Sequence, residues 1–261
     1  MSNQSRPVVL VTGAGRGIGK GIAHLLGTRG YDIALHYWDN EEDAIKLSQE
    51  LQRQGSYVEL IKGDLTKEGV PHSVVDEAFR KFGRIDSLVN NAGVTITEEF
   101  LHFEEQAVDD CYRINFLAPY LCAQRAANLM MQAGIEGTIV NITSVHQERS
   151  TDRDSVYGSM KAALARATES MAYELAPYKI RVNAIAPGRI RTSTTPLTHV
   201  DDRINDAIPI GRSGVPHDIA QVVAWLLSGE SSYVTGITIR VDGGLNLPLR
   251  RALIDENLRF F

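Results

Sequence analysis

Tyr157 and Lys161 are the two residues whose types and spacing most clearly allow chemistry. They are four residues apart, so on a helix the phenol and the ammonium would lie on the same face. A free tyrosine has a pKa of about 10, and a nearby ammonium favours the phenolate and lowers that pKa. Ser144, thirteen residues before Tyr157, offers a hydroxyl that could hold a substrate oxygen in line with the phenol. Such a pair also occurs on solvated helix faces, so a prediction of general acid-base chemistry depends on the surrounding elements.

A glycine-rich turn follows the first apolar run of the chain. It reads Thr12-Gly13-Ala14-Gly15-Arg16-Gly17-Ile18-Gly19, and a helical pattern begins directly after it. Glycine lets the backbone turn tightly and approach a ligand closely, and a helix N-terminus offers free amides and the positive end of the helix dipole. The turn therefore predicts a phosphate-binding site.

Short apolar, β-branched runs alternate with longer segments of helical period, which indicates βαβ units around a parallel sheet. The expected strands are 8–12, 32–37, 57–62, 87–90, 138–143, 181–185 and 238–241. The expected helices cover about 17–29, 40–54, 67–82, 104–133, 154–177 and 216–228. The predicted fold class is α/β, a single Rossmann-type domain over residues 1–261 with a doubly wound parallel sheet of about seven strands and helices on both faces. Segment 187–215 is expected to be a substrate-binding loop region and 245–261 a C-terminal tail.

Composition excludes several classes of function. The 27 Lys and Arg against 32 Asp and Glu give a net charge of -5, so no basic surface for nucleic acid or an anionic membrane is expected. No apolar run approaches the roughly 20 residues of a membrane span and the chain opens without a signal-like segment, which predicts a cytoplasmic protein. No residues have metal-ligand spacing, so no metal is expected. Cys111 and Cys122 are predicted to be buried free thiols.

Several motifs in a fixed order carry a family resemblance. They are Thr-Gly-x3-Gly-x-Gly from Thr12, Asn90-Asn91-Ala92-Gly93, Asn115, Ser144, Tyr157-x3-Lys161, and Pro187-Gly188. Their order and spacing from residue 7 to about residue 244 resemble the short-chain dehydrogenase/reductase family. The resemblance implies an NAD(P)-dependent oxidoreductase that acts on CH-OH groups.

The resemblance implies a role for each of four catalytic residues. Tyr157 matches the family's proton donor or acceptor at the substrate oxygen. Lys161 matches the lysine that lowers the tyrosine pKa and hydrogen-bonds the nicotinamide ribose. Ser144 matches the serine that orients the substrate, and Asn115 matches the asparagine that kinks its helix and anchors a water in the proton relay.

The resemblance also implies a set of residues that bind the cofactor. They are Gly13, Arg16, Gly17, Ile18, Gly19, Tyr37, Trp38, Asp64, Leu65, Asn91, Ala92, Gly93, Tyr157, Lys161, Pro187 and Gly188. For Asp64 and Asn91 a structural role at the strand ends is equally consistent with the sequence.

The choice between NADP and NAD depends on the end of the second strand. NAD enzymes usually carry an acidic residue there that binds the ribose 2′-hydroxyl. Tyr37 occupies this position and Arg16 lies in the glycine turn, which together favour NADP. Trp38 supplies no positive charge for a 2′-phosphate, however, and Asp39 would reverse the preference if it turned back to the ribose.

Two enzyme subgroups compete for the substrate assignment. Residues around Ser144, 208–211 and 232–238 resemble glucose 1-dehydrogenases, and Asn91 to Thr95 resembles 3-oxoacyl-carrier-protein reductases. The polar segment 148–155 suits a sugar or polyol, and the absence of Lys or Arg between Arg125 and Arg149 disfavours docking of an acidic carrier. His146 and Gln147 are the expected substrate contacts, with Ser144 and Tyr157, although His146 could equally be structural.

Other expectations concern partners. A small polar substrate is expected, and a non-catalytic dinucleotide sensor is the alternative of a different class. The family resemblance further suggests a homotetramer packed through helices 104–133 and 154–177 and the last strand.

Overall fold

The computed structural model describes residues 6–192, 205 and 208–247, and its centre is one parallel sheet of seven strands. The strands are β1 (Val8–Val11), β2 (Asp32–Tyr37), β3 (Val58–Lys62), β4 (Ser87–Asn90), β5 (Thr138–Ile142), β6 (Arg181–Pro187) and β7 (Thr238–Val241). They lie in the order β3-β2-β1-β4-β5-β6-β7, and every neighbouring pair is parallel. The strand order reverses between β1 and β4, where open α/β sheets bind their ligands.

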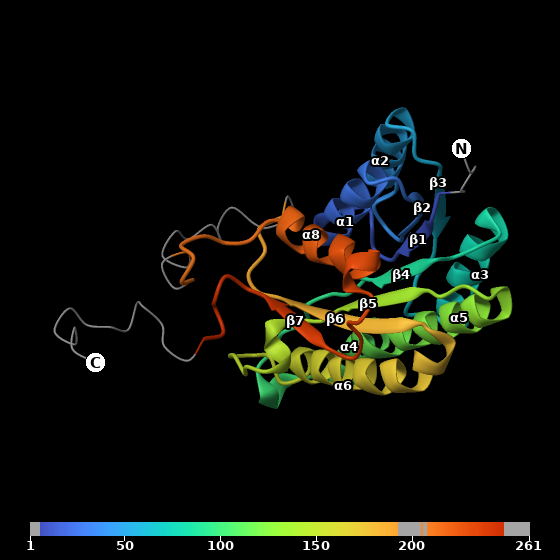
Figure 1. Cartoon of the computed structure of the whole chain (residues 1–261). Helices are drawn as coiled ribbons and strands as arrows, with labels where there is room; N and C mark the ends of the chain where they lie inside the picture. Colours follow the sequence, from blue (N-terminus) through green and yellow to red (C-terminus); the bar gives the residue numbers. More distant parts are fainter. Residues whose placement is uncertain (1–5, 193–204, 206–207, 248–261) are drawn as a thin grey trace.

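Helices cover both faces of the sheet, as Figure 1 shows. One layer contains α1 (Gly17–Thr28), α2 (Glu41–Arg53) and α8 (Pro216–Leu227). The other contains α3 (Val70–Phe82), α4 (Glu105–Tyr112), α5 (Ala118–Ala133) and α6 (Tyr157–Leu175). β1 contributes to both cores, because Val9 and Val11 pack in one hydrophobic cluster and Leu10 in the other. The predicted α/β fold with a doubly wound sheet is confirmed.

The largest difference from the expected elements lies in 104–133, which is not one continuous helix. A π-helical turn at Arg113–Leu117 separates α4 from α5, and the Ala118 N–H donates to the Arg113 carbonyl five residues back. Pro119 lacks an N–H, so the carbonyl of Asn115 loses its ordinary i+4 donor at this point. Turns of this kind are frequent at functional sites. A smaller difference is that α3 begins at Val70 rather than 67, because Gly69 is left-handed with a φ of 77°.

A buried chain of polar side chains fixes α5 and α6 against the sheet. The Asn90 amide on β4 donates to the Pro119 carbonyl and to Asn141 Oδ1 on β5, both at 2.9 Å. The Asn141 amide in turn donates to Thr168 Oγ1 on α6 at 2.9 Å. Because an unpaired buried polar group costs about 1–3 kcal/mol, this chain specifies how the helices approach the sheet.

Two predicted regions fall partly outside the described residues. In 187–215, residues 193–204, 206 and 207 are not described, while Ile190 pairs with Gly214 across this connection. In 245–261, only Leu245 to Leu247 are described.

Candidate active site

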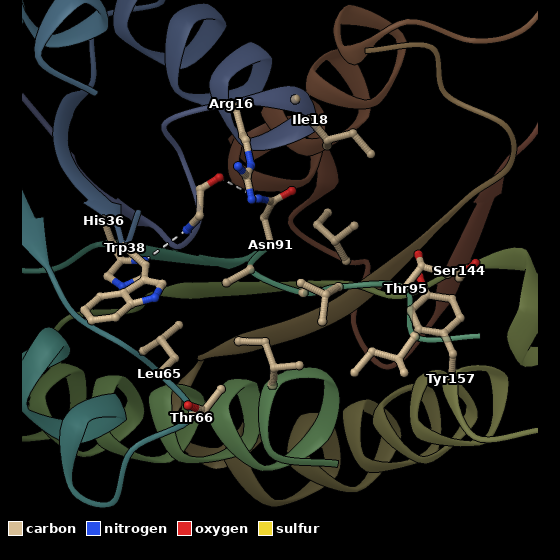
Figure 2. A pocket seen from close by; sticks show the side chains of 18 of the residues that line it. Arg16, Ile18, His36, Trp38, Leu65, Thr66, Asn91, Thr95, Ser144 and Tyr157 are labelled. Carbon is tan, nitrogen blue, oxygen red and sulfur yellow. Dashed lines mark hydrogen bonds between the residues drawn. The ribbon is translucent and has the colours of Figure 1, made fainter. Parts of the chain in front are cut away.

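A cleft of about 830 Å³ lies at the carboxyl ends of the strands. Most of the residues predicted to form the site line it. They are Gly13, Arg16, Gly17, Ile18, Trp38, Asp64, Leu65, Asn91, Ala92, Gly93, Ser144, Tyr157, Lys161, Pro187 and Gly188. Figure 2 shows Trp38 and Leu65 at one end and Ser144 and Tyr157 at the other. Five predicted residues do not line it, namely Gly19, Tyr37, Asn115, His146 and Gln147.

The glycine turn forms an open cradle at the start of α1. Gly13 and Gly17 are left-handed, with φ of 63° and 57°, which favours glycine. A Cβ on Gly19 would lie 2.3 Å from the Gly13 carbonyl oxygen, so only glycine fits there. Arg16 precedes the helix without a side-chain cap on its first amides. Uncapped amides at a helix N-terminus facing a cleft fit the pyrophosphate of a dinucleotide.

Thr12 and Asn91 lock β1 to the end of β4 beneath this cradle. Thr12 Oγ1 accepts from the Asn91 and Ala92 amides at 2.9 and 3.0 Å. The Asn91 side chain donates to the Thr12 and Gly13 carbonyls at 2.9 and 3.1 Å. Asn91 therefore has the structural role that the sequence left open, and it also lines the cleft.

At the end of β2, the residue that faces the cleft is His36 rather than Tyr37. Tyr37 is buried in the opposite core and its hydroxyl donates to Glu41 at 3.0 Å. His36 Nδ1 accepts from the Gly13 N–H, and Nε2–H donates to the Gly63 carbonyl, both at 3.0 Å. Burial lowers the pKa of His36 to about 4, so the ring is neutral at physiological pH. In the sequence, only the alternation of side chains along a strand could have predicted that His36 points to the side opposite to Tyr37.

Other residues around this end of the cleft have local partners. Trp38 is 51% exposed and lies close to His36 in Figure 2. Arg16 forms an exposed ion pair with Asp39 at 3.7 Å. The Asp64 carboxylate accepts from the amide and hydroxyl of Thr66 at 3.0 and 2.7 Å, so Asp64 also holds its own turn.

Three hydroxyl groups meet at the other end of the cleft. The Tyr157 phenol lies near the side chains of Ser144 and Thr95, which influence its pKa, and Figure 2 shows the three together. The sequence had no signal that gave Thr95 this role. Burial raises the pKa of Tyr157, and the nearby hydroxyls of Ser144 and Thr95 oppose this rise. The direction is opposite to the one expected from the Tyr-Lys pair, because burial is the largest effect.

Lys161 is almost completely buried behind Tyr157. Its Nζ donates to the Ile142 carbonyl at 3.1 Å and lies 5.7 Å from the Tyr157 ring centroid. Burial lowers the pKa of Lys161 from 10.5 to about 8. The ammonium form therefore still predominates at neutral pH.

Asn115 lies next to Lys161 but behind the wall of the cleft. Its amide donates to the Val94 and Cys111 carbonyls at 2.9 and 3.2 Å. Its Oδ1 is buried and has no hydrogen-bond partner in the described part of the chain. A Cβ on Gly93 would lie 2.8 Å from this oxygen and 3.3 Å from Lys161 Nζ, so both atoms border Gly93.

His146 and Gln147 line a second cavity of about 610 Å³ rather than the cleft. The polar segment 148–155 lines the same second cavity, together with Glu99 and Phe100. The segment that suggested a sugar substrate thus lies apart from the cleft that contains Tyr157.

Clusters of metal ligands and membrane-spanning helices are both absent from the described residues. No three His, Cys, Asp or Glu side chains in this part of the chain are grouped as metal ligands would be. None of the helices described is both long and apolar enough to cross a bilayer. Cys111 and Cys122 are buried free thiols, as predicted.

Comparison with known proteins gives consistent matches over most of the chain. A family profile described as Enoyl-(Acyl carrier protein) reductase matches residues 13–246. Glucose 1-dehydrogenase 2 of Bacillus subtilis is 34% identical over 91% of this chain and 94% of its own length. The 3-oxoacyl-[acyl-carrier-protein] reductase FabG of Staphylococcus epidermidis is 35% identical over 90% of this chain and 97% of its own length. The crystal structure of acetoin dehydrogenase from Enterobacter cloacae superposes with a TM-score of 0.89 at 36% identity, and the match covers 95% of this chain and 100% of that one.

The buried ammonium generates a prediction for Lys161→Met. Below pH 8 Lys161 is charged in both the folded and the unfolded chain, so burial of its charge opposes folding. At about 1.4 kcal/mol per pKa unit this cost is about 3 kcal/mol. Methionine removes the cost but also loses the hydrogen bond to the Ile142 carbonyl, which reduces the gain in stability by about 1–2 kcal/mol. We expect the variant to raise the free energy of unfolding by about 1–2 kcal/mol at pH 7.

Urea denaturation between pH 7 and 10.5 tests this prediction. The gain should shrink as pH rises from 8 to 10.5, because the lysine of the folded wild type is then already neutral. Lys20→Met is the matched control, since Lys20 is exposed, and it should show no such trend. A gain that grows with pH would contradict the assignment.

Proposed function

The chain belongs to the short-chain dehydrogenase/reductase family of oxidoreductases, and we propose that it interconverts a small polar alcohol, such as a sugar, polyol or hydroxyketone, and its carbonyl partner. The observation that carries the proposal is the contact of the Tyr157 phenol with Ser144 and Thr95 in the same cleft as the glycine cradle. One cleft thus combines a proton-transfer group with a site suited to a dinucleotide.

The side chains divide the chemistry among themselves. When NAD(P) is bound, its nicotinamide supplies or accepts the hydride. Tyr157 takes the proton of the substrate hydroxyl during oxidation and returns it during reduction. Ser144 and Thr95 hold the substrate oxygen beside the phenol. The positive charge of Lys161 favours the phenolate in the step in which Tyr157 has given up its proton.

The lining of the cleft supports a small substrate. The side chains of Thr95, Ser144 and Tyr157 line the cleft together with the apolar Val94 and Ile96. A compound with one or two neighbouring oxygens can bind to these hydroxyls. The relatives named for glucose and acetoin support oxidation of an alcohol beside a second oxygen. We therefore extend the sugar or polyol expected from the sequence to include a short hydroxyketone.

Reduction of a 3-oxoacyl thioester is the second candidate, because the matched FabG is 35% identical. An acidic carrier protein needs unpaired basic residues around the mouth of the cleft. The chain has no Lys or Arg between Arg125 and Arg149, which disfavours such docking and supports the small polar substrate.

A substrate panel tests the proposed activity. Purified protein is incubated with NADP or NAD and with acetoin, short polyols, aldoses or a 3-oxoacyl thioester, and the absorbance of the reduced cofactor is followed. We expect turnover with the small oxygenated compounds. Turnover of the thioester alone would establish the second candidate, and cofactor binding with no turnover would indicate a dinucleotide sensor.

Tyr157→Phe is the matched variant for the panel. It removes one oxygen, so we expect activity to be abolished while the affinity for the cofactor changes little. A variant that keeps a tenth of the wild-type rate would overturn the role of Tyr157.

We propose NADP as the preferred cofactor, as the sequence favours. Tyr37, the last residue of β2, is buried in the core and carries no carboxylate, whereas Asp39 lines the cleft two residues further on. Arg16 lines the cleft beside Trp38 and Asp39. Its ion pair with Asp39 is exposed, and such pairs contribute at most about 1 kcal/mol, so a 2′-phosphate can compete for the guanidinium.

Two substitutions test the cofactor choice. Arg16→Gln should raise KM for NADP about tenfold, the loss of about 1.4 kcal/mol of charge-assisted binding, and leave KM for NAD nearly unchanged. Asp39→Asn should lower KM for NADP, because a carboxylate repels the phosphate. If Asp39→Asn instead raised KM for NAD and spared NADP, Asp39 would be the ribose ligand and NAD the preferred cofactor.

We also propose a homotetramer. Tyr112, Phe116 and Tyr120 form a ladder along α4 and α5, with successive ring centroids 5.9 Å apart, and both tyrosines are partly exposed. An exposed aromatic surface of this kind is typical of a protein interface.

Light scattering should give the mass of four chains, and Tyr120→Lys should lower this mass. Tyr57→Lys is the control, because Tyr57 is exposed and directly precedes β3. An equal fall in mass in this control would contradict the proposed interface.

A further inference from the structure

A buried carboxylate lies three residues before Tyr157. The side chain of Asp154 is only 2% exposed. One of its oxygens, Oδ2, is 2.7 Å from His146 Nδ1, and the other, Oδ1, accepts from the Gly158 amide at 3.2 Å. Gly158 directly follows Tyr157 in the first turn of α6, so Asp154 is attached to the part of the helix that carries the phenol.

His146 contacts both Ser144 and Tyr157. Its backbone amide donates to Ser144 Oγ at 3.3 Å. Its ring meets the Tyr157 ring edge-on, with centroids 5.8 Å apart and planes at 78°. A carboxylate bound at Nδ1 fixes the orientation of the imidazole. Asp154 and His146 therefore join the turn after β5 to the start of α6.

The fit of these groups depends on the glycine at position 158. A Cβ there would lie 2.8 Å from Asp154 Oδ2 and 2.9 Å from the His146 carbonyl oxygen. Both distances are shorter than real contacts of a Cβ with an oxygen. The absence of a side chain at Gly158 thus lets the carboxylate and the His146 turn pack directly against the helix.

We propose that Asp154 and His146 are positioning residues that clamp Ser144 and Tyr157 into the geometry needed for proton transfer. The clamp rests on the proposed function, since it acts on the residues that perform it. Asp154 and His146 line the second cavity and not the cleft, so they act through Ser144 and Tyr157. The clamp replaces the expectation that His146 contacts the substrate.

The clamp also places a negative charge near the phenol. The titratable groups that influence or face Tyr157 are Asp154, His146, Cys111 from α4 and Lys161 from its own helix. Asp154 and Cys111 both raise the pKa of Tyr157, with Asp154 the larger of the two, after the larger effects of burial and of the Ser144 and Thr95 hydroxyls. Removing the charge of Asp154 should lower that pKa.

Paired variants separate geometry from charge. Asp154→Asn keeps an oxygen that accepts from the Gly158 amide and replaces the second oxygen by an NH2 group, which can donate to Nδ1 of the other His146 tautomer, and it removes the charge. Asp154→Ala removes both hydrogen bonds. In His146→Asn the amide nitrogen can take the place of Nδ1, whereas His146→Leu leaves Asp154 Oδ2 without its partner. Asp152→Asn is the control, because Asp152 is an exposed residue that lines the same second cavity.

Steady-state kinetics on the substrate found by the panel test the clamp. Asp154→Ala and His146→Leu should lower kcat at least about tenfold with KM for the cofactor within about twofold, since misplacement of reacting groups affects the chemical step. His146→Asn should recover most of kcat, and Asp152→Asn should match the wild type. A higher substrate KM with unchanged kcat in His146→Leu would overturn the proposal and make His146 a substrate contact. Unchanged kcat in every variant would also overturn it.

A second measurement does not depend on turnover. The pKa of Tyr157 can be followed by NMR of tyrosine labelled at Cζ, with the resonance assigned from its loss in Tyr157→Phe. Asp154→Asn should lower this pKa, because the negative charge of Asp154 raises it, and an unchanged or raised value would contradict the charge effect. If the wild type shows no turnover with any substrate, the proposed function fails while this titration still tests the clamp.

Discussion

The buried ammonium of Lys161 is the constraint on which the rest of the site depends. A cation out of water needs acceptors at fixed positions, and here the Ile142 carbonyl is one and Asn115 Oδ1 lies nearby across Gly93. These groups come from β5, the π-helical turn and the loop after β4. The fold must therefore hold α6 at a set distance from three other segments. The buried hydrogen bonds that run from Asn90 through Asn141 to Thr168 hold α6 against β4 and β5. None of these three side chains lines the cleft.

The two ends of the cleft place different demands on the chain. In the proposed function the backbone of the glycine cradle binds the cofactor phosphates, and the side chains there hold the turn. Thr12, Asn91 and His36 all bind backbone atoms at the cradle. At the other end of the cleft the proposed proton transfer uses the side chains of Tyr157, Ser144 and Thr95. A scaffold with this division can serve relatives named for different substrates.

Much of this organisation could be predicted from the sequence, because its signals are local. Continuous apolar runs indicated the strands, the glycine turn indicated the cradle, and the order of motifs pointed to Ser144, Tyr157 and Lys161, which line one cleft. The structure departs from the expected placement where position depends on tertiary structure. A shift of one residue along β2 separates Tyr37 from His36, and the path of a loop placed His146 at the second cavity. The direction of the Tyr157 pKa depends on burial, which spacing along a helix does not reveal.

The ring of His36 also makes the stability of the glycine cradle depend on pH. In the folded chain the ring must stay neutral, because Nδ1 accepts from the Gly13 amide, and its pKa is about 4 rather than 6.5. Between pH 6.5 and 4 His36 is therefore protonated in the unfolded chain but still neutral in the folded chain. Because of this difference, the free energy of unfolding falls as the pH is lowered through that range. The interaction that shapes the cradle thus also favours unfolding in acid.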